Sequence, residues 1–386
     1  MGDSHSASIE FATAWGLDMK LRYKILGSLL AIGAVGVAGL AAALGYESTC
    51  ESAPVVAAST DSMAAVTARC YGSSEVLQLE QLPKPELADD RVLVRVHAAS
   101  INPLDWHEMT GAPYLMRLSM GIGKPEDFRV GVDYAGVIEA VGKDVTRFKP
   151  GDEVFGGAGG AMAEYLSIGA QRNIVLKPAN VSFEQAGSVG VAGITALQAL
   201  RDHGELQAGQ RVLINGASGG VGTFAVQIAK ALGAEVTGIC SGRNVEMVKS
   251  IGADHVINYK QDDYTQRTER YDLIVDMIGN HSLSANLGVL ADGGKMVIVG
   301  GSKSNKWIDP IPGVLWAVIT QPFRDHEAAM MIAEFSPEDL QILADMMSKG
   351  QVTPVIDRRF ALDQVTQAMD YLETGRARGK VVMTLN

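Results

Sequence analysis

Cysteine is scarce in this chain of 386 residues, which contains only Cys50, Cys70 and Cys240. The set is odd in number and scattered along the sequence. It therefore suggests neither a disulfide scaffold nor a structural zinc site, which needs closely spaced ligands. Excess positive charge is missing as well, because the net charge is −11, whereas a surface that binds nucleic acid has to be basic. The missing excess of positive charge argues against nucleic acid as a main partner.

One stretch near the start has no charged residue at all. It runs for twenty residues from Ile25 to Leu44, mostly Leu, Ile, Val, Ala and Gly, which is about the length that crosses a bilayer as a helix. A retained anchor, a cleaved secretory signal and a buried helix all fit, but the run is long for a signal peptide. We therefore predict a single-pass membrane anchor that contacts the lipid bilayer, followed by a linker from Ser48 to Ser62 that is rich in Ala and Ser.

A turn of small residues in the middle of the chain separates a predicted strand from a predicted helix. The apolar run from Val212 to Ile214 is typical of a strand buried on both faces, and Phe224 and Ile228 recur at helical spacing. Glycines in such a turn let the backbone approach a pyrophosphate, and the unpaired N–H groups at the start of a helix point at it. The pattern predicts a dinucleotide-binding loop that consists of Gly216, Ala217, Ser218, Gly219, Gly220, Val221 and Gly222.

The strand that follows, predicted over Glu235 to Ile239, ends without an acidic residue. In NAD enzymes an Asp or Glu at this place holds the ribose 2′-hydroxyl. Here Ser241 and Arg243 supply a hydroxyl and a fixed cation, which would attract a 2′-phosphate. We therefore predict NADPH rather than NADH as the cofactor. The alternative is an arginine that only faces solvent at the start of a helix.

The segment from Gly209 to Lys230 resembles the quinone oxidoreductase (zeta-crystallin) signature of the medium-chain dehydrogenase/reductase superfamily. The matching residues are Gly209, Gln210, Leu213, Ser218, Gly219, Gly220, Gly222, Gln227 and Lys230. The resemblance covers Met63 to Asn386 and implies an α/β protein with a GroES-like β-rich catalytic domain and a doubly wound parallel-sheet (Rossmann) domain. With the N-terminal transmembrane helix, we expect four segments, at 1–62, 63–181, 182–302 and 303–386, the last of which returns to the catalytic domain.

Local patterns predict the same architecture. Short strands separated by turns, such as Arg91 to Ala98, indicate a β-rich unit. A helix is predicted over Ser182 to Leu200, strands over His255 to Asn258 and Tyr271 to Asp276, and a helix over Pro337 to Ser348. Strands that alternate with helices indicate a parallel sheet.

Ligands for a catalytic zinc ion are absent where zinc-dependent members of the superfamily carry them. Their cysteine ligand corresponds to the loop around Asn102 and Asp105, and their histidine ligand corresponds to Val132, which cannot bind a metal. Catalytic zinc needs about three protein ligands. We therefore predict an enzyme without metal, and interpret the nearby His107 as structural.

Catalysis without a metal depends on positioning and on a donor for the developing oxyanion. The resemblance places Asn102 beside the nicotinamide, where its amide could reach the substrate oxygen, and Tyr114 in the substrate pocket as a candidate proton donor. Asp105 is a further candidate, or else it binds a backbone N–H and holds the loop. Tyr114 could equally be a packed aromatic residue.

The resemblance also implies further cofactor contacts. Thr195 would face the nicotinamide half, Tyr259 would contact the adenosine end, and Gly300 with Gly301 would let the backbone approach the nicotinamide. Asp276, at the end of a predicted strand, is interpreted instead as a carboxylate that caps a neighbouring loop.

Together these features predict a zinc-independent, NADPH-dependent oxidoreductase that transfers hydride to a small apolar quinone, enone or related carbonyl compound. The alternatives are an NAD(P)-dependent alcohol or aldehyde dehydrogenase and a membrane-tethered NADPH-binding protein without turnover. The sequence is compatible with a homodimer. Basic residues before the apolar run favour an enzyme on the far side of the membrane, whereas the cytosolic supply of the cofactor favours the cytoplasmic face, so the membrane face stays open.

Overall fold

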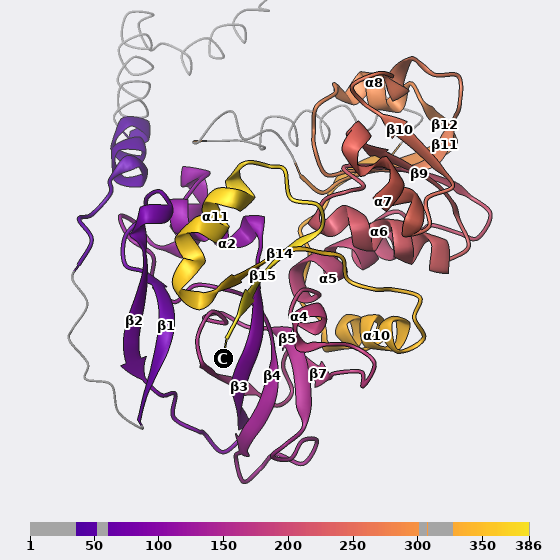
Figure 1. Cartoon of the computed structure of the whole chain (residues 1–386). Helices are drawn as coiled ribbons and strands as arrows, with labels where there is room; N and C mark the ends of the chain where they lie inside the picture. Colours follow the sequence, from indigo (N-terminus) through magenta and orange to yellow (C-terminus); the bar gives the residue numbers. More distant parts are fainter. Residues whose placement is uncertain (1–35, 52–60, 301–306, 308–326, 386) are drawn as a thin grey trace, which may run out of the picture. The chain divides into compact units, whose positions relative to one another are not determined.

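The computed structural model describes residues 36–51, 61–300, 307 and 327–385 (Figure 1). The chain divides into two units, Met1–Tyr46 and Glu47–Asn386. All of the strands named below belong to the second unit, in which the first strand begins at Ser62. The second unit therefore contains both the predicted β-rich part and the predicted parallel sheet.

The first unit contains a helix over residues 36–45. At 1.5 Å per residue this stretch spans about 15 Å, half of the hydrocarbon core of a bilayer. Within the described residues, no helix has both the length and the apolar character that crossing a membrane requires. The prediction of a single-pass membrane anchor over 25–44 is therefore wrong for the part of the anchor that the structure describes; residues 25–35 lie outside it.

Within the described residues, six parallel strands form a doubly wound sheet, as predicted. In chain order they are β8 (Arg211–Asn215), β9 (Glu235–Cys240), β10 (His255–Asn258), β11 (Tyr271–Asp276), β12 (Leu290–Ile298) and β13 (Glu327–Met330). Their order across the sheet is β10-β9-β8-β11-β12-β13, so the winding direction reverses between β8 and β11. Ligands of such sheets bind beyond the carboxyl ends of the strands at this reversal, which here are Asn215 and Asp276.

Helices and short helical turns accompany this sheet. They are α5 (Gly190–Gln198), the π-helical turn η3 (Ala199–His203), α6 (Gly220–Ala231), η4 (Gly242–Asn244), α7 (Val245–Ser250), η5 (Tyr264–Gln266), α8 (Leu283–Leu287) and α10 (Pro337–Ser348). The short helix α4 (Phe183–Ala186), which precedes α5, contacts strands of the β-rich half of the unit instead. On α6 the apolar face predicted from Phe224 and Ile228 is fully buried, in one core with Val212 and Ile214 of β8. This packing fixes the start of α6 next to the end of β8.

The helix predicted over Ser182 to Leu200 is interrupted after α4. Gly187 lies at the break, and a Cβ atom there would be 2.8 Å from the carbonyl oxygen of Ala98 in β3 (Arg91–Ile101). The backbone therefore approaches β3 too closely for a side chain. This contact joins the two halves of the unit and is invisible in the local sequence pattern.

The β-rich half consists of a seven-stranded sheet and a two-stranded sheet. Besides β3 its strands are β1 (Ser62–Ala68), β2 (Leu77–Pro83), β4 (Asp133–Val141), β5 (Glu153–Gly157), β6 (Tyr165–Gly169), β7 (Ile174–Leu176), β14 (Ile356–Ala361) and β15 (Lys380–Thr384). Its helices are η1 (Ser74–Val76), α2 (Pro103–Thr110), η2 (Tyr114–Met116), α3 (Arg117–Met120), η7 (Leu362–Gln364) and α11 (Val365–Glu373). The larger sheet has the order β14-β15-β3-β4-β5-β7, with β6 also paired to β3.

The end of the chain returns to this sheet. β15 pairs antiparallel with β3, so that Val381 lies opposite Ile101, and β14 lies on the other side of β15 (both yellow in Figure 1). Ile101 immediately precedes the loop that the sequence identified as catalytic. The C-terminal strand therefore lies next to the candidate site, although it is far from it in sequence.

Cys50 and Cys70 form a disulfide, which their spacing did not predict. The segment from Glu47 to Glu51 runs beside the loop that contains Gly123: the Ser48 N–H donates to the Gly123 carbonyl at 2.9 Å, and Glu47 forms a β-bridge with Gly123. This tertiary contact brings the two cysteines together. Cys240 is a buried free thiol at the end of β9.

Candidate active site

The glycine turn between β8 and α6 is built from backbone contacts that exclude side chains. Gly216 has a φ of +95°, a left-handed conformation that favours glycine. A Cβ atom on Gly222 would be 2.1 Å from the Gly216 carbonyl oxygen. On Gly219, by contrast, the nearest neighbour of such an atom would be that same oxygen at 3.4 Å. Gly222 is therefore needed where the turn packs against the start of α6, whereas the space next to Gly219 could accommodate a methyl group.

The start of α6 leaves donors available for an anion. The first backbone bond of the helix runs from the Thr223 N–H to the Gly219 carbonyl. Among the described residues, no backbone oxygen accepts from the N–H groups of Gly220, Val221 or Gly222. Free N–H groups at a helix start attract phosphate groups. The predicted loop therefore fits the diphosphate of a dinucleotide.

The loop after β9 lies against this turn. The amide Nδ2 of Asn244 donates to Ser218 Oγ at 2.8 Å, while its Oδ1 is buried and has no hydrogen-bond partner in the part of the chain that the structure describes. Arg243 is exposed and donates from Nη2 to the Arg376 carbonyl at 2.7 Å. Ser241 is the N-cap residue of η4 in the same loop. Sequence reasoning missed Asn244, because an Asn before a helix is typical of an ordinary helix start.

The remaining predicted cofactor contacts lie on neighbouring elements. The Thr195 hydroxyl on α5 donates to the Val191 carbonyl at 2.6 Å, and Tyr259 is exposed just after β10. A Cβ atom on Gly300 would be 2.5 Å from the Met277 carbonyl oxygen, so glycine is required there by packing as well. Gly301 lies outside the described residues.

Asp276 caps a loop, as interpreted from the sequence. Its Oδ1 accepts hydrogen bonds from the backbone N–H groups of Ile278 and Gly279, both at 3.0 Å, and from Asn215 Nδ2 at 2.9 Å. The carboxylate thus joins the ends of β8 and β11, the two strands at which the sheet reverses its winding. It stabilises the rim of the site.

The predicted catalytic loop precedes α2. The Asn102 backbone N–H donates to Asp105 Oδ2 at 2.6 Å, which is the loop-holding contact foreseen as the alternative role of Asp105. Asp105 is fully buried, and this burial raises the pKa of its carboxyl well above the usual range, against the smaller opposing effect of the Asn102 N–H. The side-chain Nδ2 of Asn102 donates to Asp133 Oδ2 at 2.9 Å, and its Oδ1 accepts from Lys380 Nζ. The catalytic roles of Asn102 and Asp105 stay predictions.

Tyr114 is held between a cation and an aromatic ring. The guanidinium carbon of Arg117 lies 4.0 Å from the centroid of the Tyr114 ring, and Trp307 contacts that ring edge-on with centroids 4.8 Å apart. His107 donates from Nδ1 to the Ala112 carbonyl at 2.6 Å, which agrees with its structural interpretation. Tyr114 is thus a packed aromatic residue in this structure, and its role as proton donor stays a prediction.

The raised pKa of Glu108 on α2 predicts that the stability of the protein depends on pH. The burial of Glu108, with a further contribution from the charge of Asp127, raises its pKa from 4.5 to about 7. Because the folded state binds this proton more tightly than the unfolded state does, its contribution to stability is complete below about pH 4.5 and is lost as the pH rises through about 7. We therefore expect Glu108→Gln to change stability little at pH 4.5 and to raise the free energy of unfolding by about 1–3 kcal/mol at pH 8.

Urea denaturation of both proteins at the two pH values measures this difference. The same substitution at the exposed Glu86 is the control, and we expect it to have little effect at either pH. A stabilisation by Glu108→Gln that is equal at both pH values would contradict the assignment.

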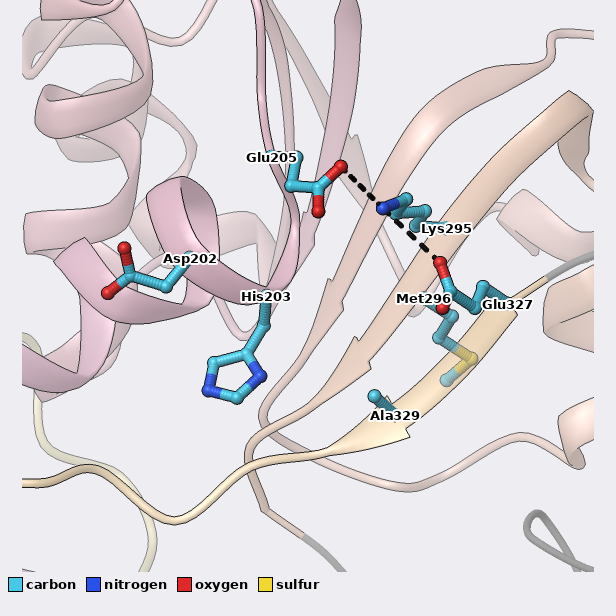
Figure 2. A pocket seen from close by; sticks show the side chains of 7 residues that line it. All are labelled: Asp202, His203, Glu205, Lys295, Met296, Glu327 and Ala329. Carbon is cyan, nitrogen blue, oxygen red and sulfur yellow. Dashed lines mark hydrogen bonds and ion pairs between the residues drawn. The ribbon is translucent and has the colours of Figure 1, made fainter.

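A separate surface cavity of about 190 Å³ lies near the other end of the sheet (Figure 2). Its lining consists of Asp202, His203, Glu205, Lys295, Met296, Glu327 and Ala329. Lys295 Nζ is 2.7 Å from a carboxylate oxygen of Glu205 and 3.2 Å from one of Glu327. Lys295 is level with Leu273 and Val212 near the amino ends of their strands, whereas the glycine turn follows the carboxyl end of β8. The cavity is therefore not part of the candidate active site.

Comparison with known proteins identifies the family. Two family models match, the alcohol dehydrogenase GroES-like domain over residues 88–179 and the zinc-binding dehydrogenase over residues 251–383. The quinone oxidoreductase of Sus scrofa is 32% identical over 348 residues, which cover 84% of this chain and 98% of that protein. The chain belongs to the medium-chain dehydrogenase/reductase superfamily. Within this superfamily it is a quinone oxidoreductase-like enzyme, which indicates a nicotinamide cofactor.

Two further relatives agree with this assignment. The 2-methylene-furan-3-one reductase of Solanum lycopersicum is 32% identical over 328 residues, covering 81% of this chain and 76% of that protein. The structure of the quinone oxidoreductase from Coxiella burnetii superposes with a TM-score of 0.74 at 31% identity and covers 84% of this chain and 100% of that one. The resemblance inferred from the glycine turn is therefore confirmed for the superfamily and for its quinone oxidoreductase-like, zinc-free members.

One of the two matching family models is the zinc-binding dehydrogenase, but this medium-chain dehydrogenase/reductase differs at the positions of the zinc ligands. The family resemblance places Val132 where zinc-dependent members carry the histidine ligand, and the neighbouring Asp133 accepts hydrogen bonds from Ser100 Oγ at 2.8 Å and from the Val191 N–H at 2.7 Å. Among the described residues, no group of three or more His, Cys, Asp or Glu side chains has the arrangement of a metal site. The residues at these positions therefore do not fit a catalytic zinc ion.

Proposed function

We propose that this protein is a zinc-independent, NADPH-dependent reductase of quinones, enones or related small apolar carbonyl compounds. The proposal rests on the glycine turn at the carboxyl edge of the sheet, where no backbone oxygen among the described residues accepts from the N–H groups of Gly220, Val221 and Gly222. The names of the relatives support the class of acceptor, since one denotes a quinone oxidoreductase and another a reductase of an unsaturated ketone.

The residues around the turn would hold the cofactor in two places. The turn from Gly216 to Gly222 would bind the diphosphate, and Ser241 with Arg243 would bind the 2′-phosphate, because a guanidinium pairs well with phosphate oxygens. Thr195, Tyr259, Gly300 and Gly301 are the further contacts expected from the family resemblance. A bound reduced nicotinamide supplies hydride to an electron-poor carbon of the acceptor.

The chain itself would contribute orientation and a hydrogen-bond donor. Asn102 has one amide hydrogen on Asp133, while the contact of Nδ2 with the Ser100 carbonyl is long, at 3.4 Å. This weakly bound N–H could donate a hydrogen bond to the substrate oxygen. Such a bond would stabilise the negative charge that develops on that oxygen. Asp105 keeps the loop in place through the Asn102 backbone N–H, and Tyr114 would form part of the wall of the acceptor site.

Turnover of NADPH with a panel of quinones, enones and aldehydes tests the proposal. The assay uses the full chain after treatment with a metal chelator and runs in both directions, with alcohols offered as hydride donors. Reduction of quinones or enones that survives chelation is the expected result. Activity that is lost on chelation and restored by zinc would contradict it, and preferred oxidation of alcohols would favour a dehydrogenase. NADPH binding without any turnover would indicate a binding protein.

Replacing Arg243 by alanine tests the choice of cofactor. If the guanidinium binds the 2′-phosphate, we expect the Kd for NADPH to rise by about tenfold or more and the Kd for NADH to change by less than about twofold. Fluorescence titration of each cofactor measures both values. Arg270→Ala removes another exposed arginine of the same half and is the control. Equal weakening of the two cofactors by Arg243→Ala would show that the phosphate assignment is wrong.

A further inference from the structure

Three polar side chains from distant parts of the sequence meet in one buried cluster. Asn102 precedes α2, Asp133 begins β4 and Lys380 begins β15, and their exposed fractions are 1%, 0% and 3%. A buried pair of charges does not by itself stabilise a protein, because the cost of removing both ions from water offsets their attraction. Its presence beside the candidate catalytic loop therefore calls for a functional explanation.

The contacts in the cluster fix the orientation of the Asn102 amide. Lys380 Nζ donates to Asn102 Oδ1 and, at 3.3 Å, to Asp133 Oδ2. Asn102 Nδ2 donates to the same carboxylate oxygen at 2.9 Å. A lysine can only donate and an ionised carboxylate can only accept. The amide oxygen must therefore face Lys380 and the amide nitrogen must face Asp133.

Lys380 also touches the glycine turn. A Cβ atom on Gly220 would lie 3.3 Å from Lys380 Cδ, and the N–H of the preceding Gly379 donates to the Ser218 carbonyl at 3.0 Å. The lysine side chain thus runs from the turn to the catalytic loop. It is the direct physical link between the residues that would hold the diphosphate and the amide that would contact the substrate.

We propose that Lys380 and Asp133 are positioning residues that hold the Asn102 amide ready for the reaction. The inference rests on the function proposed above. The cation draws electron density toward the amide oxygen, which makes the amide N–H groups stronger donors. Asp133 binds one of them at 2.9 Å, and the other, whose contact with the Ser100 carbonyl is long at 3.4 Å, can donate to the substrate in one direction. Donors that are oriented before the reaction need no reorganisation when charge develops.

Four variants test this role. Lys380→Met retains an unbranched, lysine-like stem without the charge, Lys380→Arg restores a cation, and the double variant Lys380→Met with Asp133→Asn removes both charges of the pair. Lys177→Met is the matched control, because Lys177 is also a buried lysine, with 4% of its side chain exposed, and pairs with Glu153 away from the site. The readouts are kcat and KM for a quinone acceptor, the Kd for NADPH by fluorescence, and thermal unfolding.

Lys380→Met is expected to lower kcat by about ten- to a hundredfold, with the Kd for NADPH changed by less than about threefold. Lys380→Arg should recover part of kcat. The double variant should be more stable than Lys380→Met, since it leaves no unpaired buried charge, but its kcat should stay low. A kcat that recovers together with stability in the double variant, or a loss that Lys177→Met reproduces, would show a purely structural role and overturn the proposal.

A crystal structure of the Lys380→Met variant separates this inference from the proposed function. The expected change is a displaced Asn102 amide oxygen, because Lys380 no longer holds it and Asp133 retains only the amide Nδ2. An unchanged amide would overturn the positioning role even if the wild-type enzyme reduces quinones. Absence of turnover by the wild-type protein with every acceptor would contradict the proposed function, while the orientation of Asn102 would still decide the role of Lys380.

Discussion

Replacing Gly222 by alanine is expected to abolish cofactor binding and to unfold the turn between β8 and α6. The added methyl group would lie 2.1 Å from the Gly216 carbonyl oxygen and 2.8 Å from the carbonyl carbon and Cα of Ala217. All of these are backbone atoms, so no side-chain rotation relieves the overlap. We expect the free energy of unfolding to fall by about 3 kcal/mol or more and the Kd for NADPH to rise by at least about a hundredfold.

Gly219→Ala is the matched control for this substitution. Among the described residues its methyl group would meet only the Gly216 oxygen, at 3.4 Å, and Gly219 has an ordinary φ of −85°. We therefore expect its free energy of unfolding to stay within about 1 kcal/mol of the wild type. Its affinity for NADPH should still fall, because the methyl group lies on the side that would face the diphosphate. Urea denaturation and fluorescence titration measure both effects. A stable Gly222→Ala variant with normal affinity would contradict the close packing of the turn.

Replacing Arg117 by methionine is expected to disorder the loop that carries Tyr114. The Arg117 side chain is completely buried and donates to the Gly111 and Thr110 carbonyls at 3.0 and 3.1 Å. It also pairs with Glu47 at 2.9 Å and stacks on Tyr114. Methionine would fill part of the space but would leave two carbonyl oxygens without their donor. We expect a loss of about 3 kcal/mol or more in the free energy of unfolding.

Glu47→Gln tests how much of this loss comes from the ion pair with Glu47 and how much from the hydrogen bonds of Arg117 to the two carbonyls. The Glu47 side chain is half exposed, and glutamine can still accept the hydrogen bond, so we expect a loss below about 1 kcal/mol. Urea denaturation gives both values, and limited proteolysis between residues 111 and 124 reports the loop directly. Arg117→Met should also raise KM for the acceptor with little change in the Kd for NADPH. If the loop of that variant resists protease as well as the wild type does, Arg117 does not hold it.

The elements of the parallel sheet were predictable because their signals are local. The strands at His255–Asn258 and Tyr271–Asp276 and the helix at Pro337–Ser348 have the predicted bounds. Each is an apolar or periodic run bounded by residues that favour turns or caps, so its type and limits can be read from neighbouring residues. The predicted helix over Ser182 to Leu200 is interrupted because Gly187 lies against β3, a contact that no local pattern shows.

Two predictions about the N-terminal region depended on information that the sequence does not contain. The charge-free run met the length rule for a membrane helix, yet the described helix covers only 36–45, and no helix of the described chain is suited to cross a bilayer. The cysteines were too sparse and too far apart to suggest a pair, but Cys50 and Cys70 are joined because the segment around Ser48 lies along the loop at Gly123. The length of an apolar run does not fix where a helix begins and ends, and the spacing of two cysteines does not show whether the fold brings them together.

The sequence by itself determined the strand, turn and helix that would hold a dinucleotide, and it has a valine, Val132, where the family resemblance places the histidine zinc ligand. It also placed Ser241 and Arg243 after β9. Only the tertiary structure decided what surrounds Asn102, because Lys380 lies 278 residues further along the chain and reaches the loop through the pairing of β15 with β3. Secondary structure and turn chemistry follow from neighbours in the sequence, whereas a buried network of charges exists only where the fold brings its members together.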